Sequence, residues 1–400
     1  MARLTLLSGC ALMALASETR AIEFRSGDLS GRLDTTLSAG ATWRVESRDP
    51  QLIGGFGGGT ALSANGDDGN LNYDKGDLTS MVFRATHDLD VGWRNYGAFA
   101  RLTYFYDTEI MDGDTDRTPL GQRAEDLAGR KIELLDAYVT ADYDVGNSLL
   151  GFRLGNQTFN WGESTFIPNG LNSVNVFDVT ALRQAGSELR NALKPLPAVD
   201  VSLDLTNSLA FEGFYLFQSD ETEIEPRGTF FSTNDFISPD GEFVYLGFGS
   251  PFIPDIGPTP PGANVPIGTA VPRAPDRDAG NNGQYGFALR YFAEELNATE
   301  FGLYYMRQHS RLPIVSARTG TLDGVLAGNY AGSARYFAEY PEHIVVLGAS
   351  LNAEIGTTGW ALQGEGTYRI DQPLQIDDTD ILFAALSPIS PALGQGALGS

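Results

Sequence analysis

The sequence predicts an all-β fold, a transmembrane antiparallel β-barrel of the outer-membrane type. Apolar and polar residues alternate over segments of roughly ten residues along the chain, which is the pattern of two-faced strands. The connections between these segments alternate between short and long, as the periplasmic turns and extracellular loops of outer-membrane barrels do. No segment reaches the ~18 consecutive apolar residues that a membrane helix needs, so a membrane-spanning chain of this kind crosses with strands.

The first 21 residues have the composition of a signal peptide. Arg3 supplies a positive charge, residues 4–16 are apolar, and Ala21 is a small residue suited to cleavage. Cleavage after Ala21 leaves residues 22–400, and Ala14-Leu15-Ala16 is the alternative cleavage site. Either cut removes Cys10, the only cysteine. "LSGC" at residues 7–10 also resembles a lipoprotein box, but the apolar run continues beyond it, which favours an ordinary signal peptide.

Charge and cysteine content exclude several function classes. The chain has 51 acidic and 27 basic residues and a net charge of -24, which repels nucleic acid. The mature chain has no cysteine, so it offers no disulfide or thiolate chemistry. No cofactor is expected.

Three strands stand out first, at residues 32–46, 80–93 and 96–107. In the first of them, Leu33, Leu37 and Trp43 fall on one face. Polar residues occupy the opposite face, as a wall between lipid and a polar interior requires. Eight further strands follow, at residues 135–145, 149–157, 199–206, 209–218, 284–293, 299–308, 343–355 and 360–370. The total is about eleven.

Short and long connections alternate along the whole length of the predicted barrel. They are short at residues 94–95, 146–147, 206–208, 294–297 and 356–359, and long at residues 47–79, 108–130, 158–198, 219–283 and 309–342. A secreted β-sandwich or β-helix, the alternative, has shorter strands and no reason for this order. Eleven strands starting in the periplasm end outside, whereas single-chain barrels have an even number. We therefore expect residues 22–400 to form an incomplete barrel, truncated at its C-terminal side.

Arginines recur on the polar faces of the predicted strands. On the lipid side each would cost about 2–4 kcal/mol at mid-depth, so we expect them in the lumen, paired with acidic residues. Arginines near a constriction also bias which solutes pass. The predicted lumen charges are Arg44, Arg84, Arg101, Arg153, Arg290 and Arg369.

Two oxygen-rich tracts, residues 67–77 and 111–117, are similar in composition to calcium-binding loops. Asp68, Asn70 and Asn72 have the spacing of an EF-hand start, but Tyr73 replaces the turn glycine and Thr79 the bidentate glutamate. No metal site is therefore predicted. An irregular surface calcium site is the open alternative.

The sequence predicts that the protein is not an enzyme. His87, His309 and His343 lie far apart, and no G-x-S-x-G motif is present. A triad assembled across strands is the open alternative, because geometry and not adjacency defines a triad.

Several long phrases resemble one known family. They include "NWGESTFIPNGLNSVNVFDVTALRQAGSELRNALKPLP", "STNDFISPDGEFVYLGFG" and "FGLYYMRQHSRLPIVSAR". Between about Phe24 and Gln375 the chain resembles the Gram-negative family catalogued as domain of unknown function 1302 (DUF1302). The resemblance implies a cell outer membrane protein that is linked with exporters of the resistance-nodulation-division type. It implies no reaction and no substrate.

The tract at residues 158–197 is predicted to fold into the lumen as a plug. It leaves the wall after an outward strand, and it mixes asparagines with a tryptophan and short helical segments that carry paired charges. A surface loop stabilised by its own contacts is the alternative. The residues predicted to form the plug or constriction are Asn160, Trp161, Glu163, Asn169, Asn172, Arg183, Glu188 and Arg190.

Together these features predict a porin-like outer-membrane channel or transporter for a hydrophobic or amphipathic small molecule, lipid-like molecules included. The expected partners are outer-membrane lipid, that small molecule and an exporter system. A structural or enzyme-bearing outer-membrane barrel is the first alternative, and a soluble secreted β-protein the second.

Overall fold

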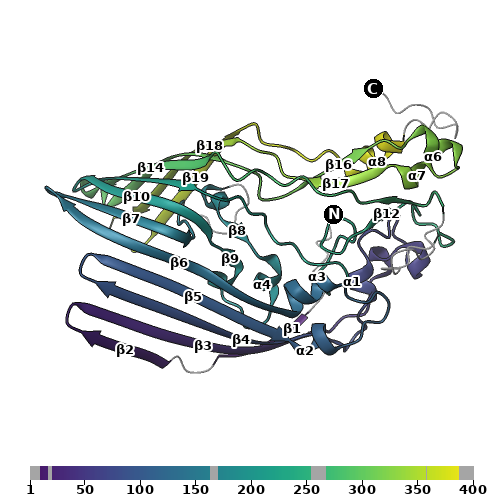
Figure 1. Cartoon of the computed structure of the whole chain (residues 1–400), viewed down its shortest axis with the longest axis horizontal. Coiled ribbons are helices and arrows are strands. Elements are labelled where there is room, and N and C mark those ends of the chain that lie inside the picture. The colour runs from purple at the N-terminus through teal and green to yellow at the C-terminus, as the bar shows by residue number, and fades with distance from the viewer. Residues whose placement is uncertain (1–9, 17–19, 163–169, 254–266, 357, 387–400) are drawn as a thin grey trace.

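The computed structural model describes residues 10–16, 20–162, 170–253, 267–356 and 358–386 (Figure 1). Its main element is one antiparallel sheet of 13 strands. In spatial order the strands are β1 (Cys10–Ala16), β3 (Leu29–Arg44), β4 (Leu78–Trp93), β5 (Tyr96–Asp107), β6 (Arg130–Val145), β7 (Ser148–Gln157), β10 (Leu196–Thr206), β11 (Leu209–Leu216), β14 (Gln284–Ala293), β15 (Thr299–Gln308), β18 (Ile344–Glu354) and β19 (Ala361–Ile370), while β2 (Arg20–Ser26) also pairs with β3.

All eleven predicted strands are present, with ends that shift by a few residues, and the predicted all-β barrel fold class of the outer-membrane type is confirmed. Two strands of this sheet, β1 and β2, were not predicted. β1 and β2 pair with different parts of one edge of β3. β1 lies within the segment predicted as a signal peptide, whose cleavage stays a prediction. Among the described residues β19 does not pair with the β1–β2 edge, so the sheet is open.

The two faces of the wall differ as the alternation predicts. Arg101 and Asp136 lie on the inner face and are largely buried, whereas Leu102, next to Arg101, and Leu134, opposite Leu102 on β6, are exposed. Exposed apolar side chains continue along the outer face of the other strands. They include Leu37, Phe83, Leu89, Tyr104, Val139, Phe152, Leu154, Phe287, Leu289, Phe301, Leu303 and Leu347.

Aromatic side chains gather beside the short turns. Trp93 stacks on Tyr96 with 5.8 Å between ring centroids, and the Tyr96 and Tyr143 hydroxyls lie 3.2 Å apart. These residues flank the turns at Arg94-Asn95 and Gly146-Asn147. Such a girdle at the end of the apolar band is typical of barrels that sit in a bilayer.

The short turns lie at one end of the wall and the folded long connections at the other (Figure 1). The long connections carry α1 (Asp68–Leu71), α2 (Thr108–Asp112), α3 (Gln122–Ala124), β12 (Phe243–Tyr245), β13 (Ala270–Pro272), β16 (Ile314–Arg318), α6 (Leu322–Leu326), α7 (Tyr330–Ser333) and β17 (Arg335–Glu339), and α8 (Asp378–Leu386) follows β19. No described helix is both long enough and apolar enough to span a membrane.

The long connections share an apolar core of their own, which the sequence did not predict. Phe236, Val244, Val271 and Tyr336 are buried in it, and Leu382 of α8 packs against it. These residues come from the connection after β11, the connection after β15 and the segment after β19. The long connections therefore fold as one cap at this end of the wall.

Candidate functional site

The tract between β7 and β10 lies against the inner face of the wall. It forms β8 (Val176–Phe177), α4 (Val179–Arg183), α5 (Leu189–Ala192) and β9 (Leu193–Lys194), and Figure 1 shows β8, β9 and α4 between the lower and upper strands. We call its described residues 158–162 and 170–195 the inner segment. The helical stretch predicted here is two single-turn helices, because Gly186 with φ +76° separates them.

Trp161 is the centre of the contact between the inner segment and the wall. Its side chain is 1% exposed, and its ring centroid lies 4.9 Å from that of Phe214 and 5.6 Å from that of Tyr304. Its indole Nε1 donates to Glu212 Oε1 at 2.8 Å. The same apolar core holds four more residues of the inner segment, Phe159, Leu171, Val174 and Val176. The inner segment therefore packs as part of the interior.

Inward-facing glycines bring the inner segment close to the wall. A Cβ atom added to Gly40 of β3 would lie 2.5 Å from the Cβ of Ala185. One added to Gly348 of β18 would clash with the Leu171 side chain. Because β3 and β18 lie near opposite ends of the strand order, the inner segment reaches across the interior.

Polar contacts fix the inner segment to the β3–β4 side. Arg190 Nη1 bonds Asp88 Oδ2 of β4 at 2.8 Å, and Arg190 Nε pairs with Glu188 at 2.7 Å. Arg84 of β4 donates to the Gln184 side chain. The predicted plug residue Arg190 therefore bonds the wall, and the predicted lumen charge Arg84 bonds the inner segment.

A second set of polar contacts fixes the other side. Arg369 Nη2 of β19 donates to Ser173 Oγ at 2.6 Å, and Gln308 Nε2 of β15 donates to the same oxygen at 3.0 Å. The Leu171 backbone N–H donates to Glu365 Oε1 of β19 at 3.1 Å. The inner segment is thus hydrogen-bonded to both sides of the interior.

A cluster of charges that the sequence did not indicate joins the inner segment to β6 and to the connection after β11. Lys131 Nζ lies 3.0 Å from Asp178 and 2.7 Å from Glu223, and Lys194 Nζ lies 2.5 Å from Glu223 and 3.1 Å from Asp220. Burial opposes ionisation of Glu223, but the two lysines outweigh it and lower its pKa. Glu223 is therefore ionised and bridges both lysines.

The predicted lumen charges form pairs on the inner face. Arg101 binds Asp88 at 2.8 Å and Asp136 at 2.9 Å, and Arg290 binds Glu212 at 2.5 Å. Since Glu212 also accepts from Trp161, this pair supports the inner segment. The predicted cross-pairing of lumen charges is therefore present at these positions.

Arg153 and Arg44 make contacts of other kinds, with an aromatic ring and with backbone carbonyls. The Arg153 guanidinium lies 5.1 Å from the Tyr138 ring centroid. Arg44, at the end of β3, donates to Asn70 O at 2.9 Å and to Tyr73 O at 3.2 Å. Arg44 therefore holds the first long connection in place, a role that the alternation of β3 could not reveal.

The interior beside the inner segment is not filled. A polar cavity of about 550 Å³ lies there, lined by Arg153, Asn160, Glu212, Arg290 and Tyr304 among others. We call it the interior cavity. Three predicted lumen or plug residues, Arg153, Asn160 and Arg290, share it.

The remaining predicted plug residues have separate places. Asn172 lies in the single turn Leu171–Val174, and Arg183 Nη1 donates to the Phe231 carbonyl at 2.9 Å. Glu163 and Asn169 lie outside the described residues.

Comparison with known sequences gives the family. The sequence pattern of the family described as "Protein of unknown function (DUF1302)" matches residues 2–399. The chain belongs to the DUF1302 family. Among curated proteins, none matches it.

Solved structures resemble this DUF1302 chain only distantly. A mutant ferric enterobactin receptor of Pseudomonas aeruginosa has 11% identity and a TM-score of 0.33, with 90% of this chain and 51% of that chain covered. The siderophore receptor PirA of Pseudomonas aeruginosa has 10% identity, a TM-score of 0.30 and 91% and 57% coverage. PirA of Acinetobacter baumannii has 11% identity, a TM-score of 0.31 and 91% and 53% coverage. The DUF1302 chain thus spans about half the length of these receptors. At TM-scores this low, the properties of the receptors are not assigned to this chain.

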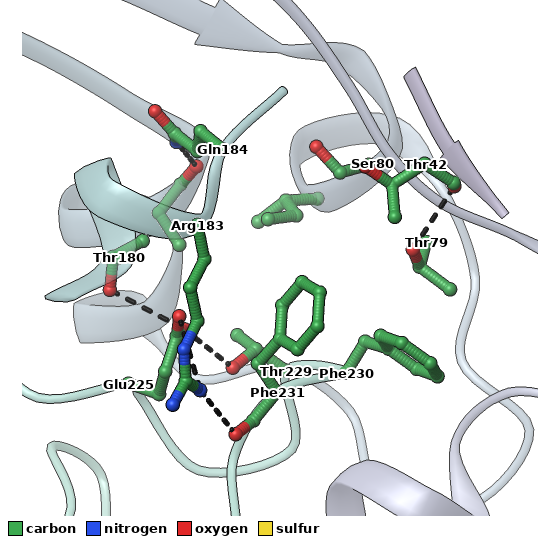
Figure 2. Close-up of a pocket in the computed structure, with 12 residues that line it drawn as sticks. Thr42, Thr79, Ser80, Thr180, Arg183, Gln184, Glu225, Thr229, Phe230 and Phe231 are labelled. Carbon is green, nitrogen blue, oxygen red and sulfur yellow. Dashed lines mark hydrogen bonds and ion pairs between the residues drawn. The ribbon is translucent and has the colours of Figure 1, made fainter. Parts of the chain in front are cut away.

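Figure 2 shows a small pocket of the DUF1302 protein between α4, the start of β4 and residues 225–231. Glu225 is buried there, and its Oε2 accepts from Thr229 Oγ1 at 3.3 Å and from Thr180 Oγ1 at 3.4 Å. Arg183 Nη1 lies 3.9 Å from Glu225 Oε1. Burial raises the pKa of Glu225 to about 7, although Arg183 opposes this shift.

A larger cavity of the DUF1302 protein lies within the cap, and we call it the cap cavity. Its volume is about 670 Å³, which is within the range of small-molecule sites. Phe236, Tyr245, Phe248 and Leu382 supply an apolar lining, while Asn65 and Asp378 add polar groups. No sequence motif marks it, because its lining comes from connections far apart in the chain.

Two of the three histidines of the DUF1302 protein meet in the structure. The rings of His309 and His343 lie 5.1 Å apart, whereas His87 bonds Thr35 on the wall. His309 Nδ1 accepts from the His343 backbone N–H at 3.1 Å, and His309 Nε2 lies 3.0 Å from the Asn282 carbonyl. Both ring nitrogens of His309 are thus engaged with backbone groups.

Proposed function

We propose that this DUF1302 protein is an outer-membrane channel or transporter and that the inner segment controls passage through it. The observation that carries the proposal is the inner segment itself, bonded to Asp88 on one side of the interior and to Arg369 on the other. Irregular backbone at membrane depth is tolerated where it is buried in protein or lines a water-filled cavity. A segment placed there obstructs the route between the short-turn end and the cap.

The proposed solute is an amphipathic small molecule. The cap cavity offers an apolar lining with Phe236 and Phe248, which suits a hydrophobic portion. The interior cavity offers Arg153, Arg290 and Glu212, which suit a polar portion. A molecule with both portions matches both cavities, and lipid-like molecules are in this class. An exporter system is the proposed partner.

The test moves the inner segment away from the wall by a substitution in the wall, so the sequence of the inner segment stays unchanged. In Gly40→Leu the new side chain meets the Ala185 backbone, which cannot rotate away, so residues 184–187 must move. We expect Gly40→Leu to raise single-channel conductance in planar bilayers at least about twofold, because displacing the obstruction widens the route.

The matched control is Gly366→Leu, since a Cβ atom at the exposed Gly366 of β19 meets nothing within 4 Å. This variant should conduct like the parent protein. Equal conductance of all three proteins, each folded and inserted, would mean that the inner segment does not limit passage.

A separate prediction concerns the orientation of the barrel in the outer membrane. An epitope tag inserted at Thr115, in the connection after α2, should be reached by antibody on intact cells, because long connections of outer-membrane barrels face outward. A tag at Asn147, in the turn between β6 and β7, should be reached only after permeabilisation. Surface labelling of the Asn147 tag alone would reverse the orientation.

A further inference from the structure

The cap cavity has an apolar rim that is open to solvent. Three of its lining residues are large, apolar and exposed, with exposed fractions of 60% for Leu52, 81% for Leu62 and 50% for Phe248. Leu52 and Leu62 belong to the first long connection, and Phe248 belongs to the connection after β11. Exposed apolar side chains that gather at one cavity mark a binding site more often than ordinary surface. The rim therefore favours the uptake of an apolar molecule.

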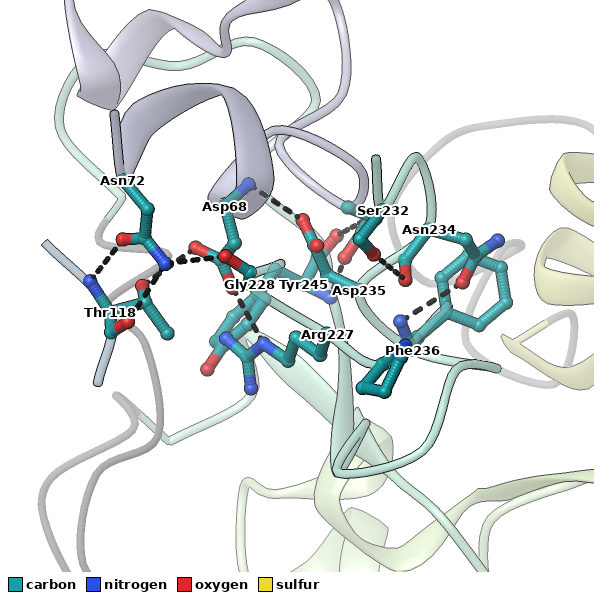
Figure 3. Close-up of polar contacts among 12 residues, drawn as sticks. Asp68, Asn72, Thr118, Arg227, Gly228, Ser232, Asn234, Asp235, Phe236 and Tyr245 are labelled. Atoms are coloured by element: carbon teal, nitrogen blue, oxygen red, sulfur yellow. Dashed lines mark hydrogen bonds and ion pairs between the residues drawn. The ribbon is translucent and has the colours of Figure 1, made fainter. Parts of the chain in front are cut away.

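The deeper lining is aromatic and is held in place by hydrogen bonds. Phe236, Tyr245 and Tyr336 are buried there. Asn65 Nδ2 donates to the Tyr245 carbonyl at 2.9 Å, and Asn65 Oδ1 accepts from the Tyr245 backbone N–H at 2.7 Å. Figure 3 shows Asn234, whose Oδ1 accepts from the Phe236 backbone N–H at 3.1 Å. Since these contacts form without a ligand, binding requires little ordering of the lining.

The charges of the lining favour a cation. Among the described residues that line the cap cavity there is no lysine, arginine or histidine, and Asp378 is the only acidic residue. Asp378 begins α8 and is exposed. Its carboxylate accepts from Thr379 Oγ1 at 3.4 Å and forms no ion pair within the part of the chain that the structure describes. The carboxylate is thus available to a ligand, and the face of an aromatic ring such as Phe248 also attracts cations.

Two arginines near the lining are each paired with a carboxylate. Both Arg227 and Arg273 lie near Tyr336. Figure 3 shows Arg227, whose Nε lies 2.5 Å from Asp68 Oδ2. Arg273 Nη2 lies 2.8 Å from Asp276 Oδ2, and its Nη1 donates to three backbone carbonyls. Neither arginine lines the cap cavity, so the described lining offers an anionic ligand no unpaired cation.

We propose that the cap cavity captures hydrophobic cations, with their apolar groups against Phe236 and Phe248 and their positive charge beside Asp378. The inference rests on the proposed transport function, and it narrows the solute from amphipathic molecules in general to those that carry a positive charge. The net charge of -24 also attracts cations to the chain over a longer range.

The test uses tetraphenylphosphonium and tetraphenylborate, which have the same shape and opposite charges. Each is added to the full chain in a neutral detergent, and its free concentration is measured by dialysis. The chain carries Cys10→Ser and Ala317→Cys, so that its only thiol lies in the lining of the cap cavity. We expect tetraphenylphosphonium to protect this thiol from a maleimide, with half-protection at a free concentration at least about fivefold lower than for tetraphenylborate.

Matched controls separate the site from general effects of the probes. In the same Cys10→Ser background, neither probe should protect the thiol of Asn147→Cys, which lies at the short-turn end of the wall. Adding Asp378→Asn to the Ala317→Cys chain should weaken protection by tetraphenylphosphonium about two- to fivefold, the effect of one exposed charge, and should not weaken protection by tetraphenylborate. Asp380→Asn, which changes an exposed carboxylate of α8 outside the lining, should keep the parent value.

Equal half-protection by the two probes would overturn the proposal, as would no protection by either, or equal losses in Asp378→Asn and Asp380→Asn. The conductance test with Gly40→Leu is independent of this one. If conductance is unchanged there and phosphonium protection is found, the transport role fails and the capture site stands. If conductance rises and phosphonium protection is absent, the transport role stands and the proposed solute class is wrong.

Discussion

Trp161→Ala is expected to lower the free energy of unfolding by about 3–5 kcal/mol, the range of a buried aromatic side chain reduced to alanine. The ring is almost fully buried between Phe214 and Tyr304, so alanine leaves a cavity that the strands cannot close. The change also removes the indole donor to Glu212. Urea unfolding of the full chain in detergent micelles, followed by fluorescence, measures the loss.

Trp161→Phe is the matched control. Phenylalanine keeps most of the apolar contact and loses the hydrogen bond, so a loss of roughly 1 kcal/mol is expected. The inner segment should also become more accessible to protease in Trp161→Ala than in Trp161→Phe. Equal losses in both variants would contradict the packing role of the indole ring.

Glu225→Gln is expected to change how stability depends on pH. The pKa of Glu225 rises from its ordinary value of 4.5 to about 7 in the folded protein. Between these values the folded state binds one more proton than the unfolded state, so stability falls as pH rises. This contribution is fully present below about pH 4.5 and is lost above about pH 7.

A glutamine at position 225 stays neutral and can still bond Thr180 and Thr229. We expect Glu225→Gln to match the parent near pH 4.5 and to exceed its stability at pH 8 by on the order of 1–3 kcal/mol. Unfolding curves of both proteins at the two pH values test this. A constant difference between them at both values would show that Glu225 does not take up a proton on folding.

The wall could be predicted because its signal is local. In β3, the alternation from Leu33 to Trp43 is enough to assign a strand and its two faces. Short turns such as Gly146-Asn147 then fix which strands are neighbours. Trp161 could be singled out for a similar reason, since a tryptophan among asparagines between two strands is unusual in a surface loop.

The cap and the charge cluster could not be predicted, since their contacts join distant parts of the chain. Phe236 packs against Tyr336, with ring centroids 5.6 Å apart, and neither lies in a periodic segment. Glu223 and Lys131 belong to different connections and strands, and nothing near either residue marks the pair. Only the folded arrangement of the wall and its connections brings such residues together.

β7 and β10 are direct neighbours in the wall, with Gln157 opposite Leu196, although residues 158–195 separate them in sequence. Their register is therefore set by strand pairing alone. The entropic cost of closing a connection grows only slowly with its length, so a long inward detour weighs little more than a short turn. The inner segment is in this sense an interchangeable insert: a scaffold of the same register would accept shorter or chemically different inserts, each giving the same wall a different interior.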